Sequence, residues 1–175
     1  MAATIGGTIK VNVTGGDLGG VYTGDFAYDD THLTKVGSES MTINGGNGTR
    51  PGLLSLNFRF LDFAEGLTPI TYTASDVDQF PDAPVLFFSN GIPTQFALQL
   101  FSASGNDAFG FLDSQIFLYA LRNGTIEGSG IVTLEINESS PESTPVPENA
   151  SPLASFLAFL GLGGVHLWRK SKKAN

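Results

Sequence analysis

Carboxylates are the side chains of this sequence whose type and spacing could do chemistry. They gather in two turn-forming stretches, one with Asp25, Asp29 and Asp30 and the other with Asp76, Asp78 and Asp82. Calcium prefers oxygen ligands of this kind, so both groups are candidate cation sites. Neither group has the spacing of an EF-hand loop with its terminal glutamate. The sequence therefore favours solvated turn carboxylates and no cofactor, with calcium as the alternative.

Histidine chemistry would depend on His32, because His166 lies in an apolar run near the C-terminus. A hydrolytic triad needs a serine nucleophile, and no Gly-x-Ser-x-Gly elbow surrounds any serine. A zinc site needs more nitrogen or sulfur ligands than one histidine supplies, and the chain has no cysteine. We therefore interpret His32 as a turn residue beside Asp29 and Asp30 and predict no catalytic residues. An enzyme that uses His32 with these carboxylates is the alternative.

Aromatic side chains could stack on sugar rings, which would make the chain a carbohydrate-binding module acting on extracellular polysaccharide. The candidates are the four tyrosines: Tyr22, Tyr28, Tyr72 and Tyr119. Aromatic residues at strand spacing more often pack against their neighbours in a core. Carbohydrate binding is therefore kept as an alternative function.

Charge is divided unevenly along the chain, whose net charge is −8. Of the 17 aspartates and glutamates, only Glu148 follows Pro145, whereas four of the nine lysines and arginines do. The acidic body excludes a nucleic-acid partner, because nucleic-acid binding depends on cationic contacts to phosphate. The absence of cysteine also excludes a disulfide framework and a cysteine nucleophile.

Short alternating stretches separated by turn residues predict an all-β domain over residues 1–137. The clearest strand is Leu53 to Phe63, with Leu54, Leu56, Phe58 and Phe60 on one face. Further strands are expected at residues 5–13, 21–28, 38–44, 70–73, 85–88, 95–101, 109–112, 115–121 and 125–136. The dipeptide Asn90-Gly91 predicts a hairpin turn. We therefore expect an antiparallel β-sandwich, jelly-roll-like in arrangement.

Three different compositions follow one another after this domain. Residues 138–151 are rich in Pro, Ser and Glu and are predicted to be a flexible linker. Residues 152–168 carry no formal charge and would span roughly 25 Å as a helix, slightly less than a hydrocarbon core. Residues 169–175 hold four cations. This order predicts one transmembrane helix, with the body outside and the basic tail in the cytoplasm.

The apolar side chains of this run surround the predicted helix instead of forming one stripe, which favours a membrane span over a short buried core helix. The residues expected to anchor it are Leu153, Phe156, Phe159, Leu160, Leu162 and Trp168. The residues expected to stop transfer across the bilayer are Arg169, Lys170, Lys172 and Lys173.

The order of Val146-Pro147-Glu148, the short apolar span and Arg169-Lys170-Ser171-Lys172-Lys173 resembles the C-terminal sorting signal of bacterial PEP-CTERM proteins. Asn149 stands where that signal has a second proline. The resemblance implies that Val146, Pro147, Glu148 and Asn149 form the sorting motif. It also implies that an exosortase, a membrane cysteine protease-transpeptidase, removes the tail. The body is similar to an all-β module found ahead of such tails in cyanobacteria, on residues 24–30, 53–63 and 85–91.

The resemblance implies a non-enzymatic protein that passes through the cell membrane and ends at the cell surface or in the extracellular matrix. Export needs an N-terminal signal, and residues 1–7 show neither a basic n-region nor an apolar h-region. We therefore expect that the gene start has been placed too late. A tail-anchored membrane protein that is not processed needs no such signal and is the alternative.

Overall fold

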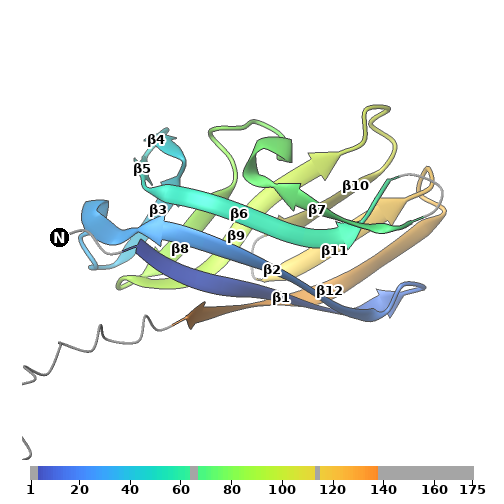
Figure 1. Ribbon diagram of the computed structural model, residues 1–175, viewed down its shortest axis with the longest axis horizontal. Coiled ribbons are helices and arrows are strands. Elements are labelled where there is room, and N and C mark those ends of the chain that lie inside the picture. The colour runs from blue at the N-terminus through green and yellow to red at the C-terminus, as the bar shows by residue number, and fades with distance from the viewer. Residues whose placement is uncertain (1–3, 64–66, 113–114, 138–175) are drawn as a thin grey trace, which may run out of the picture. The chain divides into compact units, whose positions relative to one another are not determined.

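Most of the chain that the structure describes forms β-strands, as the alternation of apolar and polar residues predicts. This computed structural model describes residues 4–63, 67–112 and 115–137 (Figure 1). All of them belong to the first of the two units into which the chain divides, Met1–Ser139 and Ser140–Asn175. Among these residues, no helix is long and apolar enough to cross a membrane. The span predicted at residues 152–168 lies outside the described residues.

The described residues form twelve strands and two short 3-10 turns. The strands are β1 (Thr4–Gly16), β2 (Gly20–Asp29), β3 (Ser38–Thr42), β4 (Asn44–Gly46), β5 (Thr49–Pro51), β6 (Leu53–Leu61), β7 (Pro69–Thr73), β8 (Val85–Ser89), β9 (Ile92–Phe101), β10 (Ala108–Leu112), β11 (Ile116–Leu121) and β12 (Ile126–Asn137). The turns are η1 (Asp30–His32) and η2 (Ala74–Asp76). Most strands coincide with the stretches that alternation predicts, whereas β4, β5 and η2 are not predicted.

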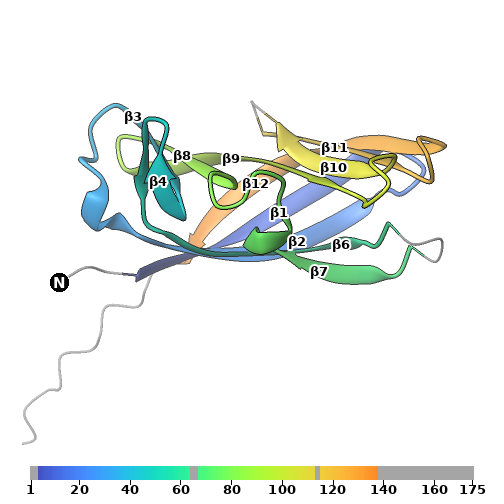
Figure 2. The same cartoon turned by 90° about the horizontal axis from the view of Figure 1, so that it is seen from above.

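All twelve strands belong to one continuous sheet, in the order β4-β5-β3-β8-β9-β10-β11-β12-β1-β2-β6-β7. Neighbouring strands are antiparallel except β3 and β5, which are parallel. The sheet folds over, so that β8 to β11 form a layer across from β2, β6 and β7 (Figure 2). The predicted all-β class is confirmed. The two layers are parts of a single sheet and not the separate sheets expected of a sandwich.

Strand β9 has different neighbours along its two halves. Ile92 to Ala97 pair with β8, whereas Leu98 to Phe101 pair with β10. Beyond the end of β8, the backbone N–H of Asp78 donates to the carbonyl oxygen of Gln99 at 2.8 Å. The loop that follows η2 is therefore held beside the second half of β9.

Aromatic rings fill the space between the two layers. Phe58 and Phe60 on β6 stack with their ring centroids 6.1 Å apart. From the opposite layer, Phe111 packs edge-on against Phe58 and Phe117 packs edge-on against Phe60, each with centroids 5.0 Å apart. All four side chains are at most 2% exposed. Edge-to-face pairs add to the stabilisation from apolar burial, so these rings join the two layers.

The buried face of β6 differs from the predicted one at the start of the strand. Leu53 is 1% exposed and Leu54 is 53% exposed, the reverse of the prediction for Leu54. A β-bulge causes the difference, because Ala27 pairs with Ser55 whereas Tyr28 pairs with Leu53. Leu54 is the extra residue and faces outward. The other three residues of the predicted face are buried.

Truncation of Phe60 should destabilise the unit far more than truncation of an exposed leucine of the same strand. Phe60→Ala leaves a cavity between the layers, and we expect the free energy of unfolding to fall by about 3–5 kcal/mol. Leu54→Ala is the matched control and should change it by less than about 0.5 kcal/mol. Urea unfolding of the full chain, followed by circular dichroism, measures both. Equal losses would contradict the outward position of Leu54.

Candidate functional site

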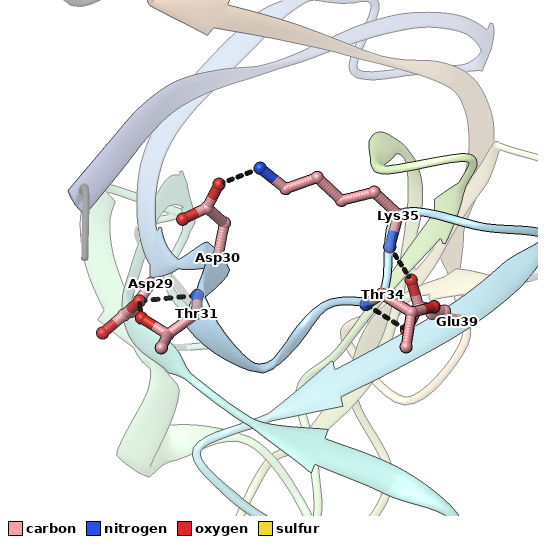
Figure 3. Close-up of polar contacts among 6 residues, drawn as sticks. All are labelled: Asp29, Asp30, Thr31, Thr34, Lys35 and Glu39. Atoms are coloured by element: carbon pink, nitrogen blue, oxygen red, sulfur yellow. Dashed lines mark hydrogen bonds and ion pairs between the residues drawn. The ribbon is translucent and has the colours of Figure 1, made fainter. Parts of the chain in front are cut away.

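Two of the first three predicted carboxylates, Asp29 and Asp30, lie where β2 ends and the connection to β3 begins (Figure 3). Oδ1 of Asp29 accepts hydrogen bonds from the backbone N–H of Thr31, at 2.8 Å, and from the Thr31 hydroxyl. The hydroxyl bond, and then the N–H bond, lower the pKa of Asp29. Oδ2 of Asp30 pairs with Nζ of Lys35 at 2.5 Å. Both carboxylates therefore have protein donors.

Glu39 on β3 organises the rest of this connection. Its Oε1 accepts from the backbone N–H of Thr34 at 2.9 Å, and its Oε2 accepts from that of Lys35 at 2.8 Å (Figure 3). Nε of Arg50 approaches Oε1 to 2.7 Å, and the Glu39 side chain is only 5% exposed. The N–H bond from Thr34 is the largest cause of the lowered pKa of Glu39, and Arg50 contributes to it. Glu39 was not among the predicted site residues, because sequence spacing does not show which carboxylate a loop will wrap around.

The tip of the β8–β9 hairpin is hydrogen-bonded to the β2–β3 connection. The Asn90 side-chain oxygen accepts from the backbone N–H of Gly37 at 2.9 Å, and the Asn90 N–H donates to the Gly37 carbonyl at 2.7 Å. Asn90 and Gly91 have φ angles of 50° and 81°, as a tight hairpin turn requires. The turn predicted from Asn90-Gly91 is therefore confirmed, and it also holds the β2–β3 connection in place.

The structure does not bring the predicted aspartates together as one ligand set. Asp25 lies on β2, where its Oδ2 accepts from the side-chain amide of Asn57 at 2.8 Å. Asp76 accepts from the N–H and hydroxyl of Thr73, at 2.7 and 2.8 Å. Asp78 and Asp82 line a surface hollow. Among the described residues, no group of three or more His, Asp or Glu side chains could hold a metal ion.

His32 is exposed at the end of η1. Its charge is a minor contributor to the lowered pKa of Asp29. Within the part of the chain that is described, no serine hydroxyl is bonded to it. The arrangement seen is that of a turn histidine beside a carboxylate that is already bonded to Thr31.

The tyrosines considered for sugar stacking belong to the core. Tyr28, Tyr72 and Tyr119 are at most 8% exposed, and Tyr22 is half-buried against Phe60. The Tyr72 hydroxyl donates to the Leu61 carbonyl at 3.0 Å, and burial raises the pKa of this phenol to about 12. Three of the four rings are therefore buried and Tyr22 is partly buried, so the tyrosines act mainly as core residues. Tyr119 is also among the residues that line a hollow on the outer face of the sheet.

Side chains that the sequence predictions missed line the outer face of β9 to β12, where Gln99 and Phe101 border a hollow. One feature of the sequence indicates this face. All six residues of β11, Ile116–Leu121, are hydrophobic. Because successive side chains of a strand point to opposite faces, some of these side chains must lie on the outer face.

Comparisons with known proteins do not classify the chain: no protein-family model, curated protein or solved structure matches it. The sorting motif, the membrane anchor and the stop-transfer residues all lie outside the described residues. The prediction for them therefore continues to depend on the sequence alone.

Acid should weaken the fold in part through Glu39. Its folded-state pKa lies below the ordinary value of 4.5, so its ionised form stabilises the fold above that pH. This contribution is lost as the pH falls through the lowered pKa. Glu39→Gln should therefore lower the urea midpoint at pH 7. It should also reduce the further drop in that midpoint between pH 7 and about pH 3.

Glu135→Gln, at an exposed position of β12, is the control and should leave both values unchanged. The same acid-induced drop in Glu39→Gln and the parent would overturn this role.

Proposed function

We propose that the chain is an exported β-domain protein of the cell surface or extracellular matrix, whose C-terminal tail is a PEP-CTERM-like sorting signal read by an exosortase. One observation carries the proposal. The motif at Val146 to Asn149, the uncharged run at residues 152–168 and the cationic end at residues 169–175 follow one another in that order after the acidic body. Strand β12 ends at Asn137, nine residues before Val146, so the whole signal lies beyond the last strand and can reach a membrane enzyme without opening the sheet.

The mechanism follows from the solvent preferences of the tail. Residues 152–168 form a helix that enters the bilayer, and Trp168 lies at the inner interface. Arg169, Lys170, Lys172 and Lys173 keep the chain from crossing further, because their ammonium and guanidinium groups are costly to place in hydrocarbon. Pro147-Glu148 is then positioned just outside the membrane, where the exosortase cuts and the body is released to the surface.

The body acts in this proposal as a stable, non-enzymatic module. The carboxylates at the β2–β3 connection support this role, because they bind backbone N–H groups and cations of their own chain. The acidity of the body also favours the outside of the membrane, with the cationic end inside.

Asn149 favours a second candidate, an unprocessed tail anchor. The motif of the family has proline at this position, and proline restricts the backbone of the residue before it. In this alternative the helix stays in the membrane and the body remains attached to it.

Processing can be measured in the chain's own host, with the region upstream of the gene restored. We expect a surface or secreted form shortened near Glu148, detected by cell fractionation and intact mass. Replacement of both Pro147 and Glu148 by alanine should leave the full-length chain in the membrane. Asn149→Pro should raise the processed fraction. Glu142→Ala, in the linker outside the motif, is the matched control and should be processed like the parent.

Two results would overturn the sorting proposal. A full-length parent chain that remains in the membrane would identify the tail as a plain anchor. Equal processing of the double alanine variant and of Glu142→Ala would show that the motif is not what the enzyme reads.

A further inference from the structure

The outer face of β9 to β12 presents apolar side chains that the core does not use. Phe101 on β9 is 49% exposed, and Leu118 on β11 is 41% exposed. Both line a hollow of about 540 Å³ that also includes residues of β10, β12 and the end of β1. The pairing register places Gly110 of β10 between Gln99 and Leu118, and Ala108 beside Phe101. The floor of the hollow is therefore made of small residues, close to the backbone.

A second hollow of about 590 Å³ adjoins the first and shares Gln99 and Leu112 with it. Its far wall is the loop after η2, which carries Asp78 and Asp82. We call the two hollows together the outer groove. The groove crosses the sheet from Gly15 on β1 to this loop. The strands β1 and β9 are four intervals apart in the sheet, which is roughly 19 Å. A groove of this length fits several linked rings.

Polar groups border the groove without partners of their own. Gln99, Glu127 and Ser129 contribute an amide, a carboxylate and a hydroxyl to its lining. These three side chains make no hydrogen bond or ion pair with other described residues. An apolar occupant would take them out of water without replacing their hydrogen bonds, which opposes binding. An occupant rich in hydroxyl groups would satisfy them.

The negative charge along the outer groove disfavours an anionic ligand. Asp78, Asp82 and Glu127 place three carboxylates along the groove, and among the described residues no lysine or arginine lines either hollow. Like charges brought together at an interface are strongly unfavourable, so an anionic ligand would be rejected. An extended peptide is also disfavoured, because the backbone groups beneath the groove already pair with neighbouring strands.

We propose that the outer groove binds several linked residues of an uncharged polysaccharide. Phe101 stacks on the apolar face of one sugar ring, and the small floor lets neighbouring rings approach the sheet. Gln99, Glu127 and Ser129 exchange hydrogen bonds with sugar hydroxyls. Tyr119, one of the tyrosines considered from the sequence, is among the lining residues, but its side chain is only 4% exposed, so the stacking ring is Phe101. The sugar-binding proposal does not depend on the sorting proposal, because every residue of the outer groove precedes Asn137, where β12 ends.

Calorimetric titration of the full chain tests the proposal. The chain is held in a polyoxyethylene detergent, which has no sugar headgroup. The probes are cellohexaose, maltohexaose, mannohexaose, xylohexaose and, as the anionic probe, hexagalacturonate. We expect at least one neutral hexasaccharide to bind and hexagalacturonate not to bind. Phe101→Ala should weaken binding about fivefold or more, because it removes the stacking ring. Leu54→Ala, an equally exposed apolar residue on β6, is the matched control and should bind like the parent.

Two more variants sharpen the test. Ala108→Leu fills the floor and should abolish binding while leaving the far-ultraviolet circular dichroism unchanged. The triple variant Asp78→Asn, Asp82→Asn, Glu127→Gln removes the carboxylates and should gain binding to hexagalacturonate.

The proposal is overturned if no neutral hexasaccharide binds, or if Phe101→Ala and Leu54→Ala weaken binding equally. It is also overturned if sedimentation shows a dimer of the parent chain that Phe101→Ala dissociates and no sugar binds. That result would assign the face to contact between two copies of the chain. Failure of sugar binding with normal tail processing would leave the sorting proposal intact.

Discussion

Contact between aromatic rings of the two layers is the interaction on which the folded sheet depends. The strand order places β6 far from β10 and β11, so no backbone hydrogen bond joins them. Phe58 and Phe60 nevertheless meet Phe109, Phe111 and Phe117 at centroid distances of 5.0 to 5.9 Å. Packed sheets lie about 10 Å apart, and large rings from both sides fill that space. A sheet that folds over in this way buries one face and leaves the other to solvent.

The ends of the layers are held by a different kind of interaction. Where the β2–β3 connection leaves the sheet, its backbone N–H groups have no strand to pair with. Asp29 and Glu39 bind those groups, and Asn90 does the same for Gly37 from the neighbouring hairpin. A carboxylate that accepts backbone bonds in a turn is typical of how aspartate stabilises turns. Of the six predicted aspartates, four thus accept a hydrogen bond or ion pair from their own chain: Asp25, Asp29, Asp30 and Asp76.

Alternation and turn chemistry predict the strands and the Asn90-Gly91 hairpin well, because both are properties of neighbouring residues. They fail for Leu54, because a single bulged residue reverses the local face without changing the composition. They also fail to show that all strands belong to one sheet, which depends on pairings between distant segments such as β1 with β12. Of the outer groove, only the apolar character of Ile116–Leu121 on both faces is visible in the sequence.

The outer groove and the tail would have different roles in a protein exported as we propose. On the sorting proposal, removal of the tail ends the attachment of the body to the membrane. All groove residues precede Asn137, so a processed chain keeps every one of them. Contiguous exposed apolar surface is unfavourable in water unless a partner covers it, and here it is bordered by hydrogen-bonding groups without partners. If both proposals hold, binding of a neutral polysaccharide would retain the body at the cell surface after the membrane anchor is lost. The acidic remainder of the body would keep released chains from associating with one another.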